Sequence, residues 1–185
     1  MRTLIVYGTR YGATAGTSDE IAKVLQGEDF DVKVVNAKEE KIKDISMYEL
    51  IIVGSGMQIG RWTGEAEDFL KRFQTHLGQK KFAIFVSSLK SMAEREGKTD
   101  EVAKIRKAAL DDRVAKYGLH PILIGFFGGV LDFNKMNIIT RKALGSIKSQ
   151  LEKDGFKESS SGVYDLRDWE EIRGWAKELA NKARQ

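Results

Sequence analysis

Residues 8–14 have the types and the spacing of a phosphate-binding turn. An apolar run ends there, and the turn contains two hydroxyl side chains, two glycines and no acidic residue. Backbone N–H groups, hydroxyls and the N-terminus of a following helix together favour a bound anion. We therefore predict a phosphate site formed by Thr9, Arg10, Tyr11, Gly12, Ala13 and Thr14.

Other phosphate-binding schemes fit this stretch less well. The chain has no G-x-x-x-x-G-K-[ST] pattern, and no G-x-G-x-x-G opens the first helix, which argues against P-loop nucleotidases and dinucleotide sites. A response-regulator receiver domain would carry acidic residues after its first strand, where this chain has Gly8, Thr9 and Arg10. An ordinary strand-to-helix turn without a ligand stays open as the alternative.

The composition excludes several kinds of chemistry. Without cysteine the chain has no disulfide, thiol nucleophile or cysteine-ligated metal, which favours a reducing cytoplasm. Two histidines argue against a metal site, and no cluster predicts a catalytic acid, base or nucleophile. The net charge of +4 comes from lysines and arginines interleaved with acids, and no nucleic-acid motif accompanies it, so we expect no nucleic-acid partner.

Short apolar runs alternate with longer amphipathic stretches, which predicts one α/β domain over residues 1–185 with a parallel sheet between helices. The expected strands are 3–7, 32–35, 50–53, 82–86 and 122–127. Apolar residues at helical spacing predict a helix behind an N-cap at Ser18, and further helices over 66–77, 100–117 and 136–153 and from Asp168 onward.

The loops after the third and fourth strands are expected to complete a ligand site. Ligands of such sheets bind outside the carboxyl ends of the strands, where these loops lie. The glycines of the third loop allow close approach of a planar ligand, and Met57, Ile59 and Trp62 offer apolar or stacking faces. The predicted residues are Ser55, Gly56, Met57, Gln58, Ile59, Gly60, Trp62, Ser87, Ser88 and Leu89.

Two interpretations of these loops stay open. Trp62 either contacts the ligand or packs into the core. The stretch 128–134, in which two glycines precede apolar side chains, forms either a cap over the ligand or a plain turn.

The spacing of Tyr7, Thr9, Gly12 and Thr14 resembles the FMN-phosphate loop of flavodoxins. The stretch 52–60 and the closing residues 164–170 extend the resemblance to the menaquinone-dependent protoporphyrinogen dehydrogenases, which are flavodoxin-domain proteins. The resemblance implies a flavodoxin-like, doubly wound, five-stranded parallel sheet of order 2-1-3-4-5 with helices on both faces. It also implies non-covalent FMN and a redox function.

The chain departs from these relatives in three respects. The alanine expected four residues after Thr14 is Ser18, and Ala22 follows one turn later, which predicts a longer loop or a helix start at Ser18. The segment 133–153 is basic but poor in aromatic residues. The net charge is basic, and the chain lacks the group of acidic residues that flavodoxins present around the flavin.

Two redox functions stay open. The first is an electron carrier that passes electrons through FMN to a redox partner protein. The second is a quinone-dependent protoporphyrinogen IX dehydrogenase of heme biosynthesis, with quinone and porphyrinogen as substrates. A third hypothesis, an interaction module without flavin, agrees poorly with the intact phosphate loop. The basic segment 135–153 either contacts an anionic membrane or packs on the sheet, and the basic surface favours a homodimer.

Overall fold

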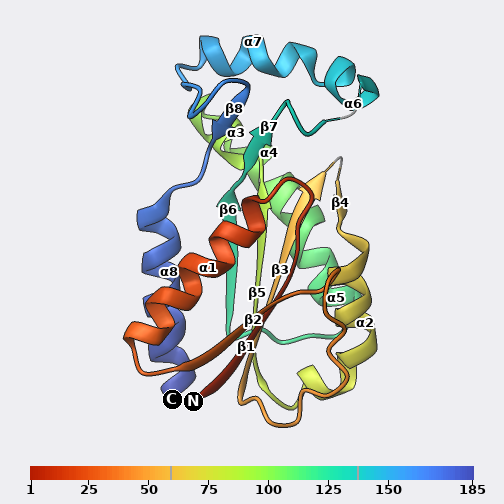
Figure 1. The fold of residues 1–185 in the computed structure, drawn as a ribbon, viewed down its shortest axis with the longest axis vertical. Helices are drawn as coiled ribbons and strands as arrows, with labels where there is room; N and C mark the ends of the chain where they lie inside the picture. Colours follow the sequence, from red (N-terminus) through yellow and green to blue (C-terminus); the bar gives the residue numbers. More distant parts are fainter. Residues whose placement is uncertain (59, 137) are drawn as a thin grey trace.

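The computed structural model describes residues 1–58, 60–136 and 138–185. A central parallel sheet has the strand order β2-β1-β3-β5-β6, with the short β4 paired antiparallel to β3 (Figure 1). Apart from β4, the five parallel strands follow the predicted order 2-1-3-4-5, which is thereby confirmed. The strands are β1 (Arg2–Gly8), β2 (Asp31–Asn36), β3 (Leu50–Gln58), β4 (Arg61–Trp62), β5 (Lys81–Ser88) and β6 (Leu123–Gly128).

Helices cover both faces of this sheet, as expected. Successive residues of a strand point to opposite faces, so Leu4 and Val6 pack on one side and Ile5 on the other. One face holds α1 (Ala13–Gly27) and α8 (Trp169–Arg184). The other face holds α2 (Gly64–Leu77) and a helical run of α4 (Thr99–Arg106), the π-helical η1 (Lys107–Asp111) and α5 (Asp112–Lys116). The short α3 (Lys90–Arg95) follows β5.

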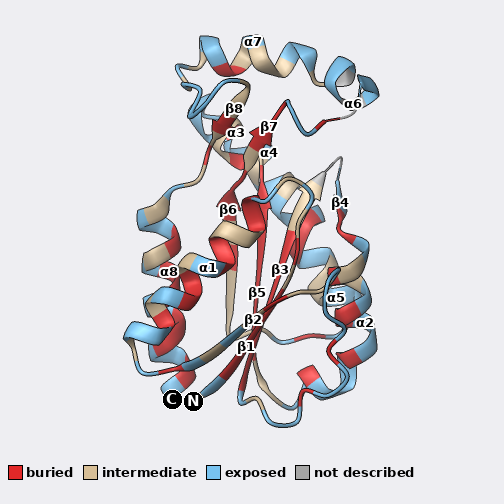
Figure 2. Ribbon diagram, in the orientation of Figure 1, coloured by how far each residue is buried: buried red, intermediate tan, exposed pale blue. Residues whose placement is uncertain are grey.

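A third layer lies above the carboxyl ends of the strands (Figures 1 and 2). We call residues 130–165 the cap. Its elements are β7 (Val130–Asp132), α6 (Ile138–Ala143), α7 (Gly145–Lys153) and β8 (Val163–Asp165). The strands β7 and β8 pair antiparallel. The cap has a separate apolar cluster, formed by Leu131, Phe133, Met136, Leu151 and Tyr164 together with Leu166. The stretch 128–134 leads from the end of β6 through β7 into this layer, and its role as a cover for the ligand stays a prediction.

The start of α1 corrects two expectations. The helix begins at Ala13, directly after Gly12, so the loop is not one turn longer and Ser18 is not the N-cap. Gly12 adopts φ 95°, a left-handed conformation that lets the chain turn from β1 straight into the helix. Ser18 lies inside α1 and is fully buried. The predicted helix over 136–153 also differs, because it is divided into α6 and α7.

The predicted start of the last helix at Asp168 is confirmed, and it yields a test of stability. Asp168 Oδ1 accepts hydrogen bonds from the backbone N–H groups of Glu170 (2.9 Å) and Glu171 (3.1 Å). Asp168→Ala should lower the free energy of unfolding by about 1 kcal/mol, because two N–H groups lose their acceptor.

Thermal denaturation checks this expectation. A loss of that size lowers Tm by roughly 2–4 °C in a chain of this length. Asp168→Asn is the matched control, because its side-chain oxygen keeps the acceptor, and it should stay near the parent protein. Equal losses in both variants would contradict the capping role.

Candidate functional site

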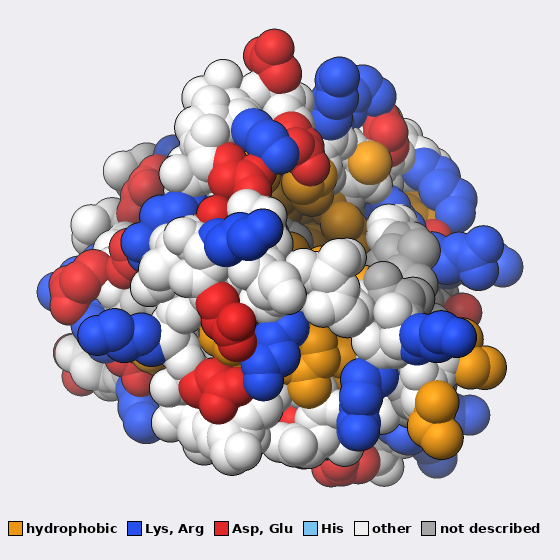
Figure 3. Space-filling view, turned by 90° about the horizontal axis from the view of Figure 1, so that it is seen from above, with side chains coloured by type: hydrophobic (Ala, Val, Ile, Leu, Met, Phe, Trp, Pro, Cys, Tyr) orange, Lys and Arg blue, Asp and Glu red, His pale blue; other side chains and the backbone are white. Residues whose placement is uncertain are grey.

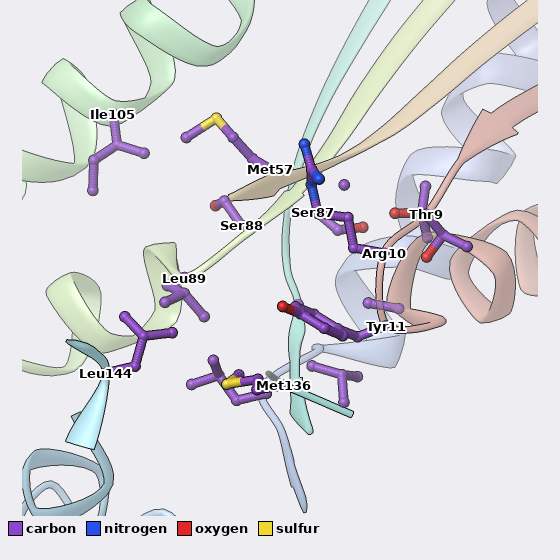
Figure 4. Close-up of a pocket in the computed structure, with 16 residues that line it drawn as sticks. Thr9, Arg10, Tyr11, Met57, Ser87, Ser88, Leu89, Ile105, Met136 and Leu144 are labelled. Atoms are coloured by element: carbon purple, nitrogen blue, oxygen red, sulfur yellow. The ribbon is translucent and has the colours of Figure 1, made fainter. Parts of the chain in front are cut away.

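A cavity of about 220 Å³ lies at the carboxyl ends of β1, β3 and β5, below the cap (Figure 4). Viewed from above, this end of the molecule has a hollow with apolar side chains in it (Figure 3). The lining residues come from the three predicted loops, from α4 and from the cap. They are Thr9, Arg10, Tyr11, Ala13, Thr14, Gly56, Met57, Ser87, Ser88, Leu89, Ile105, Gly129, Val130, Leu131, Met136 and Leu144.

The N-terminus of α1 forms the polar end of this cavity. Its N-cap residue Gly12 has no side chain to bond the first N–H groups, and no acidic residue stands in the first turn. The backbone N–H of Gly12 donates to Thr9 Oγ1 at 3.0 Å, which holds the loop in place. Such a helix end presents N–H donors and a partial positive charge to the cavity. This arrangement favours an anionic group, and a phosphate in particular.

Two buried hydroxyls in the cavity wall have no protein partner among the described residues. Thr14 Oγ1 lies in the first turn of α1, and Ser87 Oγ lies near the end of β5. A buried hydroxyl without a partner costs about 1–3 kcal/mol, so a ligand with polar atoms would recover that free energy. In contrast, Ser88 Oγ already accepts from the backbone N–H of Lys90 (3.2 Å). Thr14 and Ser87 are therefore the side chains suited to bind a polar ligand.

Arg10 supplies the charge at this end of the cavity. Its side chain is exposed overall, and Nη2 donates to the carbonyl oxygen of Trp62 at 3.3 Å. Among the described residues that line the cavity, Arg10 carries a charge and none is a carboxylate. The electrostatics of the lining are thus favourable to an anion.

Burial, then the charges of Asp19 and Glu39, raise the pKa of Tyr7 on β1, so its phenol stays protonated at neutral pH.

The opposite end of the cavity is apolar. Its side chains come from Leu89 after β5, from Ile105 of α4, and from Leu131, Met136 and Leu144 of the cap. Figure 4 shows the Tyr11 ring between Arg10 on one side and Met136 on the other. Tyr11 and Leu89 also pack against the apolar cluster of the cap. A ligand with a phosphate and a planar apolar ring system would match these two ends.

One glycine keeps the space beside Thr14 open. A Cβ placed on Gly56 would lie 3.1 Å from Thr14 Oγ1 and 3.8 Å from the carbonyl oxygen of Gly8. Any larger residue at position 56 would therefore crowd the hydroxyl that faces the cavity. Close approach of a planar ligand to the glycines of the third loop stays a prediction.

The structure brings most of the predicted site residues together, but Trp62 is a correction. Its side chain is only 3% exposed, and its indole N–H donates to the carbonyl oxygen of Ala109 at 2.7 Å. The ring belongs to the core between β4 and η1 and does not line the cavity, so the expected stacking face is absent. Of the two interpretations of Trp62, contact with the ligand or packing in the core, the structure supports packing in the core.

Several other predicted residues support the site without lining it. Ser55 Oγ accepts from the N–H of Thr63 (3.1 Å) and donates to the carbonyl of Gly56 (3.0 Å), which links β3 to the residue that follows β4. Gly12 acts through the backbone, and Gly60 lies in an exposed turn with φ 70°. Gln58 ends β3, but its side chain and the whole of Ile59 lie outside the described residues.

Sequence reasoning missed Ile105, Met136 and Leu144. All three occur in helical patterns, and a stripe of apolar residues does not say which surface it will contact. Only Leu131 and its neighbours carried a signal, through the two glycines that precede them.

Comparisons with known proteins agree with this geometry. A family model described as a flavodoxin domain matches residues 4–158. A protein of Leishmania major called protoporphyrinogen IX dehydrogenase [quinone] is 22% identical over 180 residues, covering 97% of this chain and 74% of that protein.

Solved structures of flavodoxins share the fold. A flavodoxin from the domain Archaea superposes with a TM-score of 0.57 at 16% identity, over 100% of both chains. A short-chain flavodoxin associated with a non-canonical PDU bacterial microcompartment gives 0.58 at 16% identity, over 99% of both chains. Because the family model spans most of the sequence, the chain belongs to the flavodoxin domain family and is a flavin-binding redox protein.

Proposed function

We propose that the protein binds FMN non-covalently in this cavity and carries electrons to a redox partner protein. The observation that carries the proposal is Thr14 Oγ1, which is buried without a protein partner at the N-terminus of α1. A flavin without a phosphate would leave this hydroxyl and the helix N-terminus unused. A phosphate ester would meet both, together with Arg10.

The two ends of the cavity then have separate roles. Thr9, Arg10, Gly12, Ala13 and Thr14 would hold the phosphate, and Tyr11 and Met57 would contact the ring system. Ser87 would bond a polar atom away from the phosphate, and Leu89 would exclude water beside it. FMN supplies the electron transfer when bound. The chain's own residues would position the flavin and exclude water from it. The charge they supply is that of Arg10, and no acidic residue is among the described residues that line the cavity.

A second candidate function is a quinone-dependent protoporphyrinogen IX dehydrogenase. The observation that favours it is the apolar wall formed by Leu131, Met136 and Leu144 of the cap, which extends the cavity beyond the phosphate loop. A planar apolar substrate would find a second surface there. The relative from Leishmania major carries that activity in its name.

Two further points concern the setting. No helix within the described ranges has the length and apolar character to cross a bilayer. The chain also has no cysteine, which supports our proposal that the protein works in the reducing cytoplasm.

The role of Thr14 can be tested by comparing FMN with riboflavin. Thr14→Ala should weaken FMN binding about 10-fold or more, because a hydrogen bond to a charged phosphate is lost. Riboflavin, which lacks the phosphate, should bind the variant and the parent protein alike. Both affinities are measured by titrating apoprotein with each flavin and monitoring the quenching of flavin fluorescence.

Two variants serve as controls for Thr14→Ala. Thr14→Ser keeps the hydroxyl and should retain most of the FMN affinity. Thr17→Ala removes another buried hydroxyl of α1 that has no partner but does not line the cavity, so it should leave both flavins unaffected. An equal loss of FMN and riboflavin in Thr14→Ala would contradict the phosphate role.

Ser87 should behave differently from Thr14. Ser87→Ala should weaken FMN and riboflavin equally, by roughly 3- to 10-fold, because a neutral hydrogen bond is lost at the part that both flavins share. The same titrations measure it. Ser88→Ala is the neighbouring control, since Ser88 Oγ already bonds to the backbone. A selective loss of FMN in Ser87→Ala would place the phosphate nearer β5.

Carrier and dehydrogenase differ in how the flavin takes up electrons. We expect a reductive titration with dithionite to show two spectrally distinct one-electron stages, as a carrier requires. A single two-electron stage, together with oxidation of protoporphyrinogen when a quinone is added, would favour the dehydrogenase. Apoprotein that retains neither FMN nor riboflavin would contradict both proposals.

A further inference from the structure

The cap exposes two large apolar side chains next to each other. Ile138 and Ile139, at the start of α6, are 83% and 81% exposed. Burial of such side chains is normally favourable, so a pair left this open is unusual for a surface that only meets water. The chain's other strongly exposed apolar residue of this size within the described part, Met47, lies in the connection between β2 and β3 and is 55% exposed.

Basic residues surround this pair. Positions 135–149 contain Lys135, Arg141, Lys142 and Lys148 and no acidic residue. Lys135 pairs with Asp132 (3.2 Å) and Lys148 with Glu158 (3.0 Å). Arg141 and Lys142 form no ion pair with any described residue, and both are exposed. Their charges are therefore available to an external partner.

The helix places these apolar and basic side chains together. Residues three and four apart share a face of a helix, so Ile138 is next to Arg141 and Lys142, and Ile139 is next to Lys142. Arg141 Nη2 donates to the carbonyl of Met136 at 3.4 Å, which ties the helix to a residue of the cavity wall.

We propose that α6 is a membrane-docking element for an anionic bilayer. Ile138 and Ile139 enter the boundary between headgroups and acyl chains, and Arg141 and Lys142 contact lipid phosphates. Long basic side chains can keep their charge in the headgroup layer while their stems cover apolar surface. An apolar tip beside cations that lack protein partners is the pattern of a helix that lies in a membrane surface.

A protein partner fits this surface less well. Stable protein interfaces bury about 1,200 Å² or more and have a broad apolar centre, whereas the exposed apolar part here is two side chains on a six-residue helix. A second copy of the chain would also bring a like-charged surface against Arg141 and Lys142. A lipid surface requires no matching shape and supplies the opposite charge.

Docking through α6 would also bring the cavity to the membrane. Met136 and Leu144, which stand before and after α6, both line the cavity. A lipid-soluble electron acceptor such as a quinone would then approach the cavity from the bilayer. This last step rests on the proposed flavin function, whereas membrane binding itself does not.

Vesicle sedimentation tests the docking. The purified protein should bind vesicles of phosphatidylcholine with phosphatidylglycerol, bind pure phosphatidylcholine weakly, and dissociate as salt is added. Ile138→Ser with Ile139→Ser should weaken binding to the anionic vesicles about 10-fold or more. Arg141→Ser with Lys142→Ser should weaken it by roughly 5-fold for each charge removed.

Matched controls carry the same chemical changes elsewhere. Met47→Ser removes an exposed apolar side chain, and Lys41→Ser with Lys43→Ser removes two exposed charges between β2 and β3. Both controls should bind anionic vesicles nearly as the parent protein does, apart from a small effect of net charge in the second. Flavin absorbance, measured on every variant, separates a failure of docking from a failure of the flavin site.

Three outcomes would overturn the proposal. The parent protein would fail to bind anionic vesicles, or the controls would weaken binding as much as the α6 variants. Alternatively, sedimentation in solution would show a dimer that the two isoleucine substitutions dissociate, which would assign α6 to contact with a second copy.

Discussion

The short turn from Gly8, where β1 ends, to Ala13, where α1 begins, is the constraint on which the site depends. Gly12 adopts a left-handed conformation that turns the chain into the helix, so the connection is short. The N-terminus of α1 therefore lies at the carboxyl edge of the sheet. The parallel register then aligns the neighbouring loops, with Gly8 opposite Ser55 and Gly56 opposite Ser87. Thr14, Gly56 and Ser87 meet for that reason, although they are far apart in sequence. An added residue between β1 and α1 would move the helix end away from that row.

The apolar end of the cavity depends on a second junction. The cap leaves the sheet after β6 and returns before α8, and the two ends of this excursion touch. The backbone N–H of Leu166 donates to the carbonyl of Gly129 at 2.9 Å, and a Cβ on Gly128 would overlap the carbonyl of Leu166. With its ends joined and an apolar cluster that Tyr11 also contacts, the cap is held over the turn between β1 and α1.

Local signals predicted much of this arrangement, and long-range contacts decided the rest. The five strands were readable because strands buried on both faces are continuously apolar, and the grouping of Thr9, Arg10 and Thr14 at one end of the cavity because these residues are close in sequence. The fate of Trp62 depended on Ala109, which is 47 residues away. The roles of Met136 and Leu144, which flank α6, depended on how the cap folds over the cavity. Serine is a common N-cap residue, which is why the sequence predicts a cap at Ser18, whereas the helix begins after Gly12 through backbone conformation alone.

The two ends of the cavity make different demands on function. The polar end is complete in itself, because a phosphate there needs only the loop, the helix end and Thr14. The apolar end is more than such a cofactor site requires, since the chain adds a layer with its own core and places it above the carboxyl edge of the sheet. A carrier must leave its redox centre open to a protein partner, whereas a dehydrogenase benefits from a wall that shelters a substrate. The cap is therefore the part of the molecule that separates the two functions, because it adds an apolar wall that a carrier does not need.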